Sequence, residues 1–403
     1  MKASGFFLTE VVTGGKSVNK TDWRSAYLRL CPQVGLKNLE QPFVYHIGRD
    51  ELYEIDDRAK DFLAHCDGTH RGNELTSEAA FIAYCLEEGL LELVPHPGPI
   101  HISINQAVNP SLRYLELQLL HRCNLQCLHC YLGPAQYNDM ALTDALAVTQ
   151  EFAAMGGLRL MISGGEPLLY KDLRTFIAQT ADLKLRRVLL SNGTLIDSDN
   201  IDWLHVEEIQ ISLDGWKKGH DMLRGEGAFE RTMKGIHAAK EGGLALSFAT
   251  MIHQGNLDEF DRMRDFMEEI GAIEWGIDVP VLAGSLANHQ HLHVPYEEAA
   301  PLMAYSYGGG YHGSSDGYTC GRHLLTVMPA GQAVKCGFYR EKTLGDARGS
   351  LKDCWLKLEH IPISRLECQD CPVIEDCAGG CRFRASHPLG PDPVMCALYG
   401  ISK

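Results

Sequence analysis

The stretch LLHRCNLQCLHCYLGP, residues 119–134, places three cysteines in the spacing Cys-x3-Cys-x2-Cys, at Cys123, Cys127 and Cys130. It overlaps the end of YLELQLL (114–120), a short apolar run rich in strand-forming residues. A structural zinc site usually takes four ligands, often as two pairs, so three thiols on one loop leave one metal position open. The stretch therefore predicts a buried strand followed by a metal centre that can bind another molecule.

Composition limits the alternatives. A chain of 403 residues is expected to form two or three domains, and a net charge of -15 argues against a dominant nucleic-acid surface. The start, MKASGFFLTEVVTGGK, lacks the pattern of a secretory signal, and no uncharged apolar run reaches membrane-spanning length. We therefore expect a cytoplasmic protein with no nucleic-acid or membrane partner.

The fourteen cysteines are unevenly distributed. Three lie at 123–130 and eight between 320 and 396, whereas Cys31, Cys66 and Cys85 stand apart. Because disulfides are rare in the cytoplasm, clustered thiols there indicate metal ligands.

The middle of the chain alternates apolar runs with amphipathic stretches. We expect strands at 114–120, 158–164, 186–193, 207–215, 244–252 and 272–280. Helices are expected at 172–183, 228–243 and 256–271, and from Thr143, a candidate N-cap, to Met155. This alternation predicts an α/β fold with a parallel sheet, here a partial (β/α)6 TIM barrel over residues 101–310. The chemistry of such barrels lies at the carboxyl ends of the strands.

The three-cysteine loop resembles the signature of the radical S-adenosylmethionine (SAM) superfamily, and the resemblance extends over residues 112–280. It implies that Cys123, Cys127 and Cys130 bind a 4Fe–4S cluster, whose fourth iron is chelated by SAM. One electron from that cluster then cleaves SAM to a 5′-deoxyadenosyl radical. Tyr131 matches an aromatic position that is common after the last cysteine. A zinc loop or reduced surface thiols are the alternative interpretations.

Other segments resemble SAM contacts of that superfamily. Gly164-Gly165-Glu166-Pro167 resembles the GGEP motif, which implies contact with the methionine amino group; glycines allow close approach and a carboxylate suits an ammonium. Ser191-Asn192 and Ser212-x-Asp214 resemble positions that touch the ribose or the methionine, with turn and cap chemistry as the alternative. Arg224 resembles an arginine that pairs with the methionine carboxylate, with an exposed arginine as the alternative.

Residues 311–403 resemble the SPASM extension of radical SAM enzymes. The matching positions are Cys320, Gly331, Cys336, Cys368, Cys371, Cys377, Cys381 and Cys396. The resemblance implies two auxiliary 4Fe–4S clusters, and hence three clusters in all. It assigns one to Cys320, Cys336 and Cys381, and the other to Cys368, Cys371, Cys377 and Cys396.

The first auxiliary cluster lacks an obvious fourth thiolate. Either Cys354 completes it, or one iron is open to substrate. Cys354 stands in LKDCWLKLE, a helical-looking stretch, and is equally a candidate core residue beside Trp355. Two zinc knuckles are the alternative for the whole segment.

Residues 1–100 are expected to form a winged helix-turn-helix. PFVYHIGRDELYEID (42–56) predicts a hairpin with Gly48-Arg49-Asp50 at its turn, and helices are expected at 57–66 and 77–93. The pattern resembles the RiPP recognition element, which binds the leader of a ribosomally made peptide as an added strand, here on 43–47 or 51–55. The stretch 14–35 fits poorly and is interpreted as an insertion. A DNA-binding winged helix or a structural cap is the alternative.

Two cysteines of this region, Cys66 and Cys85, fall on apolar helical positions and are expected in its core.

These features predict a radical SAM peptide maturase that uses a precursor peptide and an external one-electron donor such as flavodoxin or ferredoxin. A cysteine thioether of the sactipeptide or ranthipeptide type is the leading product, because an open iron would accept a substrate thiolate. The alternatives are carbon–carbon or carbon–oxygen cross-linking, or radical chemistry on a small molecule or tetrapyrrole. GGEP and the open-ligand triad argue against a non-catalytic iron–sulfur carrier.

Overall fold

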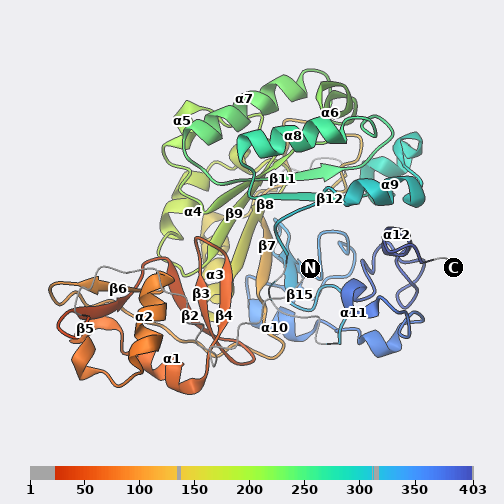
Figure 1. Cartoon of the computed structure of the whole chain (residues 1–403). Coiled ribbons are helices and arrows are strands. Elements are labelled where there is room, and N and C mark those ends of the chain that lie inside the picture. Colours follow the sequence, from red (N-terminus) through yellow and green to blue (C-terminus); the bar gives the residue numbers. More distant parts are fainter. Residues whose placement is uncertain (1–22, 134–137, 311, 313–316, 402–403) are drawn as a thin grey trace.

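The computed structural model describes residues 23–133, 138–310, 312 and 317–401. A large sheet runs through the middle of the molecule (Figure 1). Its strands are β7 (Tyr114–Gln118), β8 (Arg159–Ser163), β9 (Arg186–Ser191), β10 (Glu208–Ser212), β11 (Leu246–Met251), β12 (Glu274–Asp278), β13 (Leu324–Val327), β14 (Gln332–Val334) and β15 (Gly345–Asp346). They lie in the order β12-β11-β10-β9-β8-β7-β13-β14-β15, with parallel pairing from β12 to β13. The six predicted parallel strands are confirmed, and β13 adds a seventh that was not predicted.

Helices connect the parallel strands, as expected for β/α units. They are α3 (Leu142–Ala154), α4 (Leu173–Gln179), α5 (Ser198–Ile201), α6 (Lys217–Arg224), α7 (Ala228–Glu241) and α8 (Phe260–Ile270). In α8, Phe260, Met263 and Met267 recur at three- and four-residue spacing and are buried, which is the pattern of a helix with one apolar side. Gly271 ends α8 with φ of 70°, a left-handed conformation that glycine adopts at low cost.

Three helices of the barrel differ from the expected ones. α5, a helix of four residues, was not predicted. α3 begins at Leu142 after Ala141, so Thr143 lies in its first turn and is not the N-cap. α6 was not predicted, because Gly219 weakens its helical pattern. The structure gives a reason for that glycine, since a Cβ atom there would collide with Glu259.

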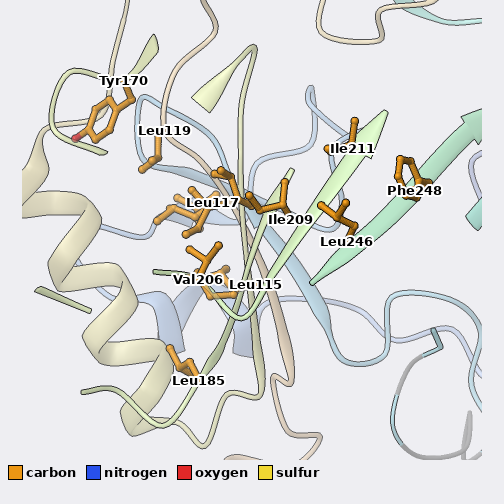
Figure 2. Close-up of a cluster of buried hydrophobic side chains, with 14 of the residues drawn as sticks. Leu115, Leu117, Leu119, Tyr170, Leu185, Val206, Ile209, Ile211, Leu246 and Phe248 are labelled. Atoms are coloured by element: carbon orange, nitrogen blue, oxygen red, sulfur yellow. The ribbon is translucent and has the colours of Figure 1, made fainter. Parts of the chain in front are cut away.

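Figure 2 shows the apolar core on the helix-covered side of the sheet. Leu115 and Leu117 of β7 and Ile209 of β10 are fully buried in it. Because successive strand residues face opposite sides, Glu116 and Gln118 of β7 face the interior of the open barrel. Burying a leucine contributes roughly 1.5–3 kcal/mol to folding, so the apolar side stabilises the sheet while the inner side carries polar groups.

The N-terminal domain contains two small antiparallel sheets. β1 (Tyr27–Leu30) lies between β5 (Asp67–Arg71) and β6 (Leu91–Val94), and β3 (Pro42–His46) lies between β2 (Val34–Asn38) and β4 (Glu51–Glu54). Helices α1 (Asp57–Ala64) and α2 (Ala79–Glu87) share a core with the first sheet. The predicted hairpin at 42–56 is confirmed, and Cys66 and Cys85 are fully buried in that core, as predicted.

Three expectations for this domain are wrong. Residues 27–35 are no insertion, because β1 is a central strand with Leu28 fully buried; residues 14–22 lie outside the described residues. The helix expected at 77–93 ends at Glu87, because Gly89 turns the chain with φ of 63° and Leu91–Val94 pairs with β1. Residues 43–47 are no sheet edge, because β3 is paired on both sides.

Buried polar contacts fix the N-terminal domain to the amino ends of the barrel strands. Asp50, at the β3–β4 turn, forms an ion pair with Arg159, the first residue of β8. Lys37 of β2 is buried, and its Nζ donates to the carbonyls of Gly157 and Lys184, each at 2.7 Å. This end of the barrel is therefore closed by the N-terminal domain, while the opposite end is free for chemistry.

The C-terminal segment extends the sheet and then becomes rich in loops. Its helices are α10 (Leu351–Leu356), α11 (Ile374–Cys377) and α12 (Pro393–Leu398), and α12 packs on α9 (Tyr296–Met303), which lies between β12 and this segment. Because β13 pairs with β7, the sheet continues past residue 310 into this segment. Among the described residues, no helix combines the length and the apolar character that a bilayer crossing requires.

Candidate active site

Loops that follow four neighbouring strands carry the predicted SAM- and cluster-binding residues. The cysteine loop follows β7, residues 164–167 follow β8, Ser191 and Asn192 close β9, and Asp214 follows β10. Because the carboxyl ends of parallel strands meet at one edge of the sheet, these residues gather at one end of the barrel.

The three cysteines of the loop lie close together. Cys123, Cys127 and Cys130 are partly buried, and their thiols act on one another electrostatically. The Leu128 amide donates to the carbonyl of Leu223 in α6 over 2.9 Å, which fixes the loop against that helix. Burial raises the pKa of the Cys127 thiol to about 11, so the metal-free thiol keeps its proton at neutral pH. A bound metal removes such protons, and three adjacent soft donors fit an iron–sulfur cluster.

Gly164 and Gly165 allow the second loop to meet the first. A Cβ atom on Gly164 would collide with the carbonyl oxygen of Leu120, and one on Gly165 with that of Arg122. Gly164 also has φ of 141°, which other residues rarely adopt. The amides of Gly165 and Glu166 donate to the same two carbonyls, each over 2.8 Å. The glycine pair therefore holds the GGEP segment against the start of the cysteine loop.

Glu166 is fully buried and bridges the ends of β8 and β9. Its carboxylate accepts hydrogen bonds from Ser191 Oγ at 2.9 Å, from the Asn192 amide at 2.8 Å and from the Leu168 amide at 3.1 Å. Burial raises the pKa of Glu166 to about 6, although these donors oppose the shift. Pro167 is the first residue of the short 3-10 helix that follows. A buried carboxylate at this position suits the ammonium group of an amino acid.

Asn192 connects this carboxylate to the cysteine loop. Its Nδ2 donates to Asn124 Oδ1 at 2.9 Å and lies 3.7 Å from Cys123 Sγ. Its Oδ1 accepts from Thr194 Oγ1 at 2.6 Å, which fixes the orientation of the amide. An amide N–H beside a cysteine sulfur suits a cluster ligand, because hydrogen bonds to sulfur tune such centres.

Arg224 and Asp214 form an ion pair inside the site. Arg224 Nε lies 2.5 Å from Asp214 Oδ2, and Arg224 Nη1 lies 3.9 Å from Cys127 Sγ. Burial opposes ionisation of Asp214, but Arg224 and His129 outweigh it and hold the pKa well below its usual range. The sequence predicted Asp214 and Arg224 as separate SAM contacts, whereas in the structure the two side chains pair with each other beside the cysteine loop. Ser212 is half-buried at the end of β10.

A polar cluster inside the barrel was not predicted from the sequence. Glu116 of β7 accepts hydrogen bonds from Ser163 of β8 and Thr326 of β13, each over 2.8 Å. Gln118 Nε2 also donates to it at 3.0 Å, and the Tyr131 hydroxyl at 3.3 Å. The only available signal was a glutamate at an inward position of an otherwise apolar strand. The cluster connects the cysteine loop to a strand of the C-terminal segment.

Four C-terminal cysteines surround one cavity. The thiols of Cys368, Cys371, Cys377 and Cys396 line it, together with apolar residues such as Met395. Four thiols around one space fit a four-thiolate iron–sulfur cluster.

The other C-terminal cysteines divide into a group and a separate residue. Burial raises the pKa values of the Cys336 and Cys381 thiols, and neighbouring thiols raise them further: Cys320 and Cys381 act on Cys336, and Cys320 acts on Cys381. The three thiols therefore lie close together. Cys354 of α10 is 2% exposed and packs in the main apolar core with Trp355. Burial raises the pKa of its thiol, Lys357 lowers it, and the carboxylates of Asp346, Asp353 and Glu151 raise it. The structure thus brings together three of the four thiols considered for the first auxiliary cluster.

Aromatic rings connect the two cysteine groups. Tyr131, next to Cys130, lies 5.1 Å between ring centroids from Phe338. Phe338 lies 5.2 Å from Phe383, which follows Cys381 by two residues. The barrel site and the C-terminal group are therefore parts of one continuous packed region.

Residues 117–267 match the Radical SAM superfamily. The chain therefore contains a radical SAM domain, and it is an enzyme. Such a domain implies a 4Fe–4S cluster and SAM, and the donors at the carboxyl end of the barrel fit both groups.

Relatives fall into two functional classes. The AdoMet-dependent heme synthase of Nitratidesulfovibrio vulgaris is 25% identical over 334 residues, 70% of this chain and 90% of the relative. The PqqA peptide cyclase of Granulibacter bethesdensis is 26% identical over 325 residues, 70% of this chain and 86% of the relative. Streptococcus suis SuiB, solved with its precursor peptide SuiA, has a TM-score of 0.65 at 16% identity, covering 91% of this chain and 98% of SuiB. This last likeness shows a shared fold over most of the chain.

Proposed function

We propose that this radical SAM enzyme matures a ribosomally made precursor peptide and forms a thioether between a peptide cysteine and a carbon atom. The leader of the precursor binds the N-terminal domain, and the segment to be modified enters the barrel. When bound, the cluster and SAM supply the radical that abstracts hydrogen, and the chain's own residues hold both groups in place.

The main support for peptide recognition is that one edge of β4 is open. Among the described residues β4 pairs with β3 alone, and Glu54 at its end is exposed. The other edge, β2, is covered, since Lys37 is bonded to the barrel. The Ile55 amide donates to the Pro42 carbonyl over 3.1 Å, and strand amides alternate in direction, so the amide of Glu54 points away from β3. An extended peptide can pair with this edge through its backbone.

The fold of SuiB supports this assignment. The first 100 residues make up about a quarter of this chain, so a coverage of 91% includes most of them. SuiB was solved with a precursor peptide, and this supports a peptide substrate here. We interpret the N-terminal domain as a RiPP recognition element of the winged helix-turn-helix type.

Three thiols without a fourth support thioether chemistry. We assign Cys320, Cys336 and Cys381 to a first auxiliary cluster, and we interpret Cys354, which is 2% exposed, as a residue of the apolar core. One iron of that cluster then lacks a protein thiolate, and a deprotonated peptide cysteine is its natural soft ligand. The four thiols around one cavity are assigned to a second auxiliary cluster.

The residues at the barrel end have distinct roles in this proposal. Glu166 holds the ammonium of SAM, and Arg224, oriented by Asp214, pairs with its carboxylate. Ser191 and Asn192 orient Glu166 through hydrogen bonds to its two oxygens. Thioether formation removes one hydrogen atom from a C–H group and one proton from the thiol. One electron must therefore also leave the substrate.

The relatives favour two other products as second candidates. Similarity to an AdoMet-dependent heme synthase over 70% of the chain favours a tetrapyrrole substrate. Similarity to a PqqA peptide cyclase favours carbon–carbon or carbon–oxygen cross-linking of a peptide. The open edge of β4 favours a peptide over a tetrapyrrole as the substrate, because a tetrapyrrole has no peptide backbone that could pair with this strand.

Mass spectrometry separates these products. A candidate precursor encoded beside this gene is incubated anaerobically with reconstituted enzyme, SAM and reductant. We expect a product lighter by two hydrogen atoms that has lost one thiol to alkylating reagents. The same mass loss with every thiol still open to alkylation would indicate that another cross-link forms instead of a thioether. An unchanged peptide alongside conversion of an iron tetrapyrrole would overturn the peptide proposal.

A further inference from the structure

A groove in the C-terminal segment is lined by both apolar and basic side chains. Leu344, Leu358 and Ile361 are among the apolar ones. It is formed near α10 and β15, which pack against each other in the C-terminal segment (Figure 1). All of its lining residues lie between 335 and 389, so none belongs to the N-terminal domain or to the six barrel strands.

The charges of this groove are opposite to those of the chain. The whole chain has a net charge of -15, yet Lys335, Lys342, Lys357 and Arg365 line the groove with Glu359 as the one carboxylate. Glu359 forms an ion pair with Arg365, whose Nη1 lies 3.2 Å from Glu359 Oε1. In the described part of the chain, the three lysines have no ion-pair partner. Basic side chains that outnumber the carboxylates around them produce a positive local potential.

The groove reaches the first group of C-terminal thiols. Tyr339 lines the groove, and its backbone amide donates to the carbonyl of Cys336 over 2.9 Å. Lys335 precedes Cys336 in the chain, and its Nζ lies 5.5 Å from the centroid of the Tyr339 ring. A protein seated in the groove would therefore lie one side chain away from these thiols.

We propose that this groove is the docking surface for a small acidic electron-carrier protein. The inference rests on the proposed function, because it takes Cys320, Cys336 and Cys381 as ligands of an auxiliary cluster. Thioether formation withdraws one electron from the substrate, and an oxidised carrier accepts one electron and is reduced by one. No covalent bond forms or breaks at the groove. Complementary charge brings the carrier to the surface where this electron is released.

An acidic segment of the precursor peptide is the competing occupant. The location favours the carrier, because the peptide must reach both β4 and the interior of the barrel, and the groove is lined by residues of neither. Charge complementarity also implies that binding weakens as salt screens the lysines.

Binding of an acidic flavodoxin to the full-length, iron-loaded enzyme tests the proposal, in the absence of peptide. Calorimetry at low and high salt is compared for the wild type and for Lys335→Gln/Lys342→Gln/Lys357→Gln. The control is Lys217→Gln/Lys234→Gln/Lys240→Gln, which removes the same charge from exposed positions on α6 and α7. We expect the groove variant to bind about tenfold more weakly with a flatter salt dependence, and the control to change by less than about twofold.

Iron content is measured for each variant, because Lys335 adjoins Cys336. If the triple variant loses iron, the double variant Lys342→Glu/Lys357→Glu is used instead, because it keeps Lys335. We expect it to weaken flavodoxin binding at least as much as the triple variant does. Equal losses in the groove and control variants would overturn the proposal. So would unchanged flavodoxin binding together with weakened precursor binding, which would make the peptide the occupant. Because the assay contains no peptide, its failure leaves the peptide proposal standing.

Discussion

Binding of SAM is expected to weaken as the pH falls through the pKa of Glu166. This side chain is fully buried, and burial raises its pKa to about 6 despite the hydrogen bonds that it accepts. Glu166 therefore takes up a proton in a range where exposed glutamates are ionised. Since only the ionised carboxylate attracts the SAM ammonium, protonation removes the contact.

The size of the effect follows from the pKa. If SAM binds only enzyme with an ionised Glu166, the apparent Kd is the intrinsic Kd divided by the ionised fraction. With a pKa of about 6, the apparent Kd rises about fourfold between pH 8 and pH 5.5, and about elevenfold by pH 5.

The stability of the fold depends on the protonation of Glu166 in the opposite direction from SAM binding. Because the folded pKa exceeds the unfolded one, the contribution of Glu166 to stability is present at low pH and is lost as the pH rises through about 6.

Calorimetric titration of reconstituted enzyme with SAM measures this dependence. Glu166→Gln should bind at least about tenfold more weakly at pH 8, because hydrogen bonds to charged groups contribute about 1.5–3 kcal/mol. Glu151→Gln is a matched control. Glu151 also accepts hydrogen bonds from two backbone amides and a serine hydroxyl, those of Leu351, Lys352 and Ser350, but it does so at the start of α10. It should keep the wild-type pH dependence.

Two results would contradict the role proposed for Glu166. A constant Kd from pH 8 to pH 5.5 in the wild type would mean that Glu166 does not hold the ammonium or does not titrate there. An identical pH dependence in Glu166→Gln would assign the effect to another group.

Replacing the three cysteines of the barrel loop by alanine should abolish SAM cleavage and remove about four irons per chain, as iron analysis will show; retained cleavage would contradict the cluster assignment. Cys354→Ala should leave iron content and paramagnetic resonance spectra unchanged while lowering the free energy of unfolding by about 1 kcal/mol, because only core packing is lost; loss of a cluster would make Cys354 a ligand. Asp50→Asn keeps a residue that tolerates φ of 56° but leaves Arg159 without its carboxylate, so urea unfolding should show a loss of about 3 kcal/mol. The exposed Asp57→Asn should change stability far less, and equal effects would refute the role given to the buried pair.

The barrel was predictable because its signals are local and repeated. Each parallel strand is a short apolar run, and each connection carries helical periodicity, so the six strands could be placed from the sequence. β13 could not, because LLTV is four residues long and its partner β7 lies some 200 residues earlier in the chain. Pairing over such a separation leaves no pattern in either segment alone.

The site was predictable as far as its motifs extend. The cysteine spacing and GGEP indicated candidate site residues, and the structure brings these residues to one end of the barrel. The partners of these residues were not predictable. Nothing in the sequence indicates that Arg224 pairs with Asp214, or that Lys37 and Asp50 contact the barrel, because each contact depends on the packing of distant elements.

A comparison of two variants shows whether the precursor leader pairs with the backbone of β4, as we propose. Glu54→Pro removes an amide that points away from β3, which an edge strand tolerates, whereas Glu54→Ala keeps that amide and removes only the exposed side chain. The affinity of full-length precursor is measured for the wild type and both variants, with leaderless precursor as the reference. We predict that Glu54→Pro binds full-length precursor as weakly as the wild type binds the leaderless form, while Glu54→Ala binds like the wild type. Equal binding by the proline and alanine variants would contradict leader pairing with β4.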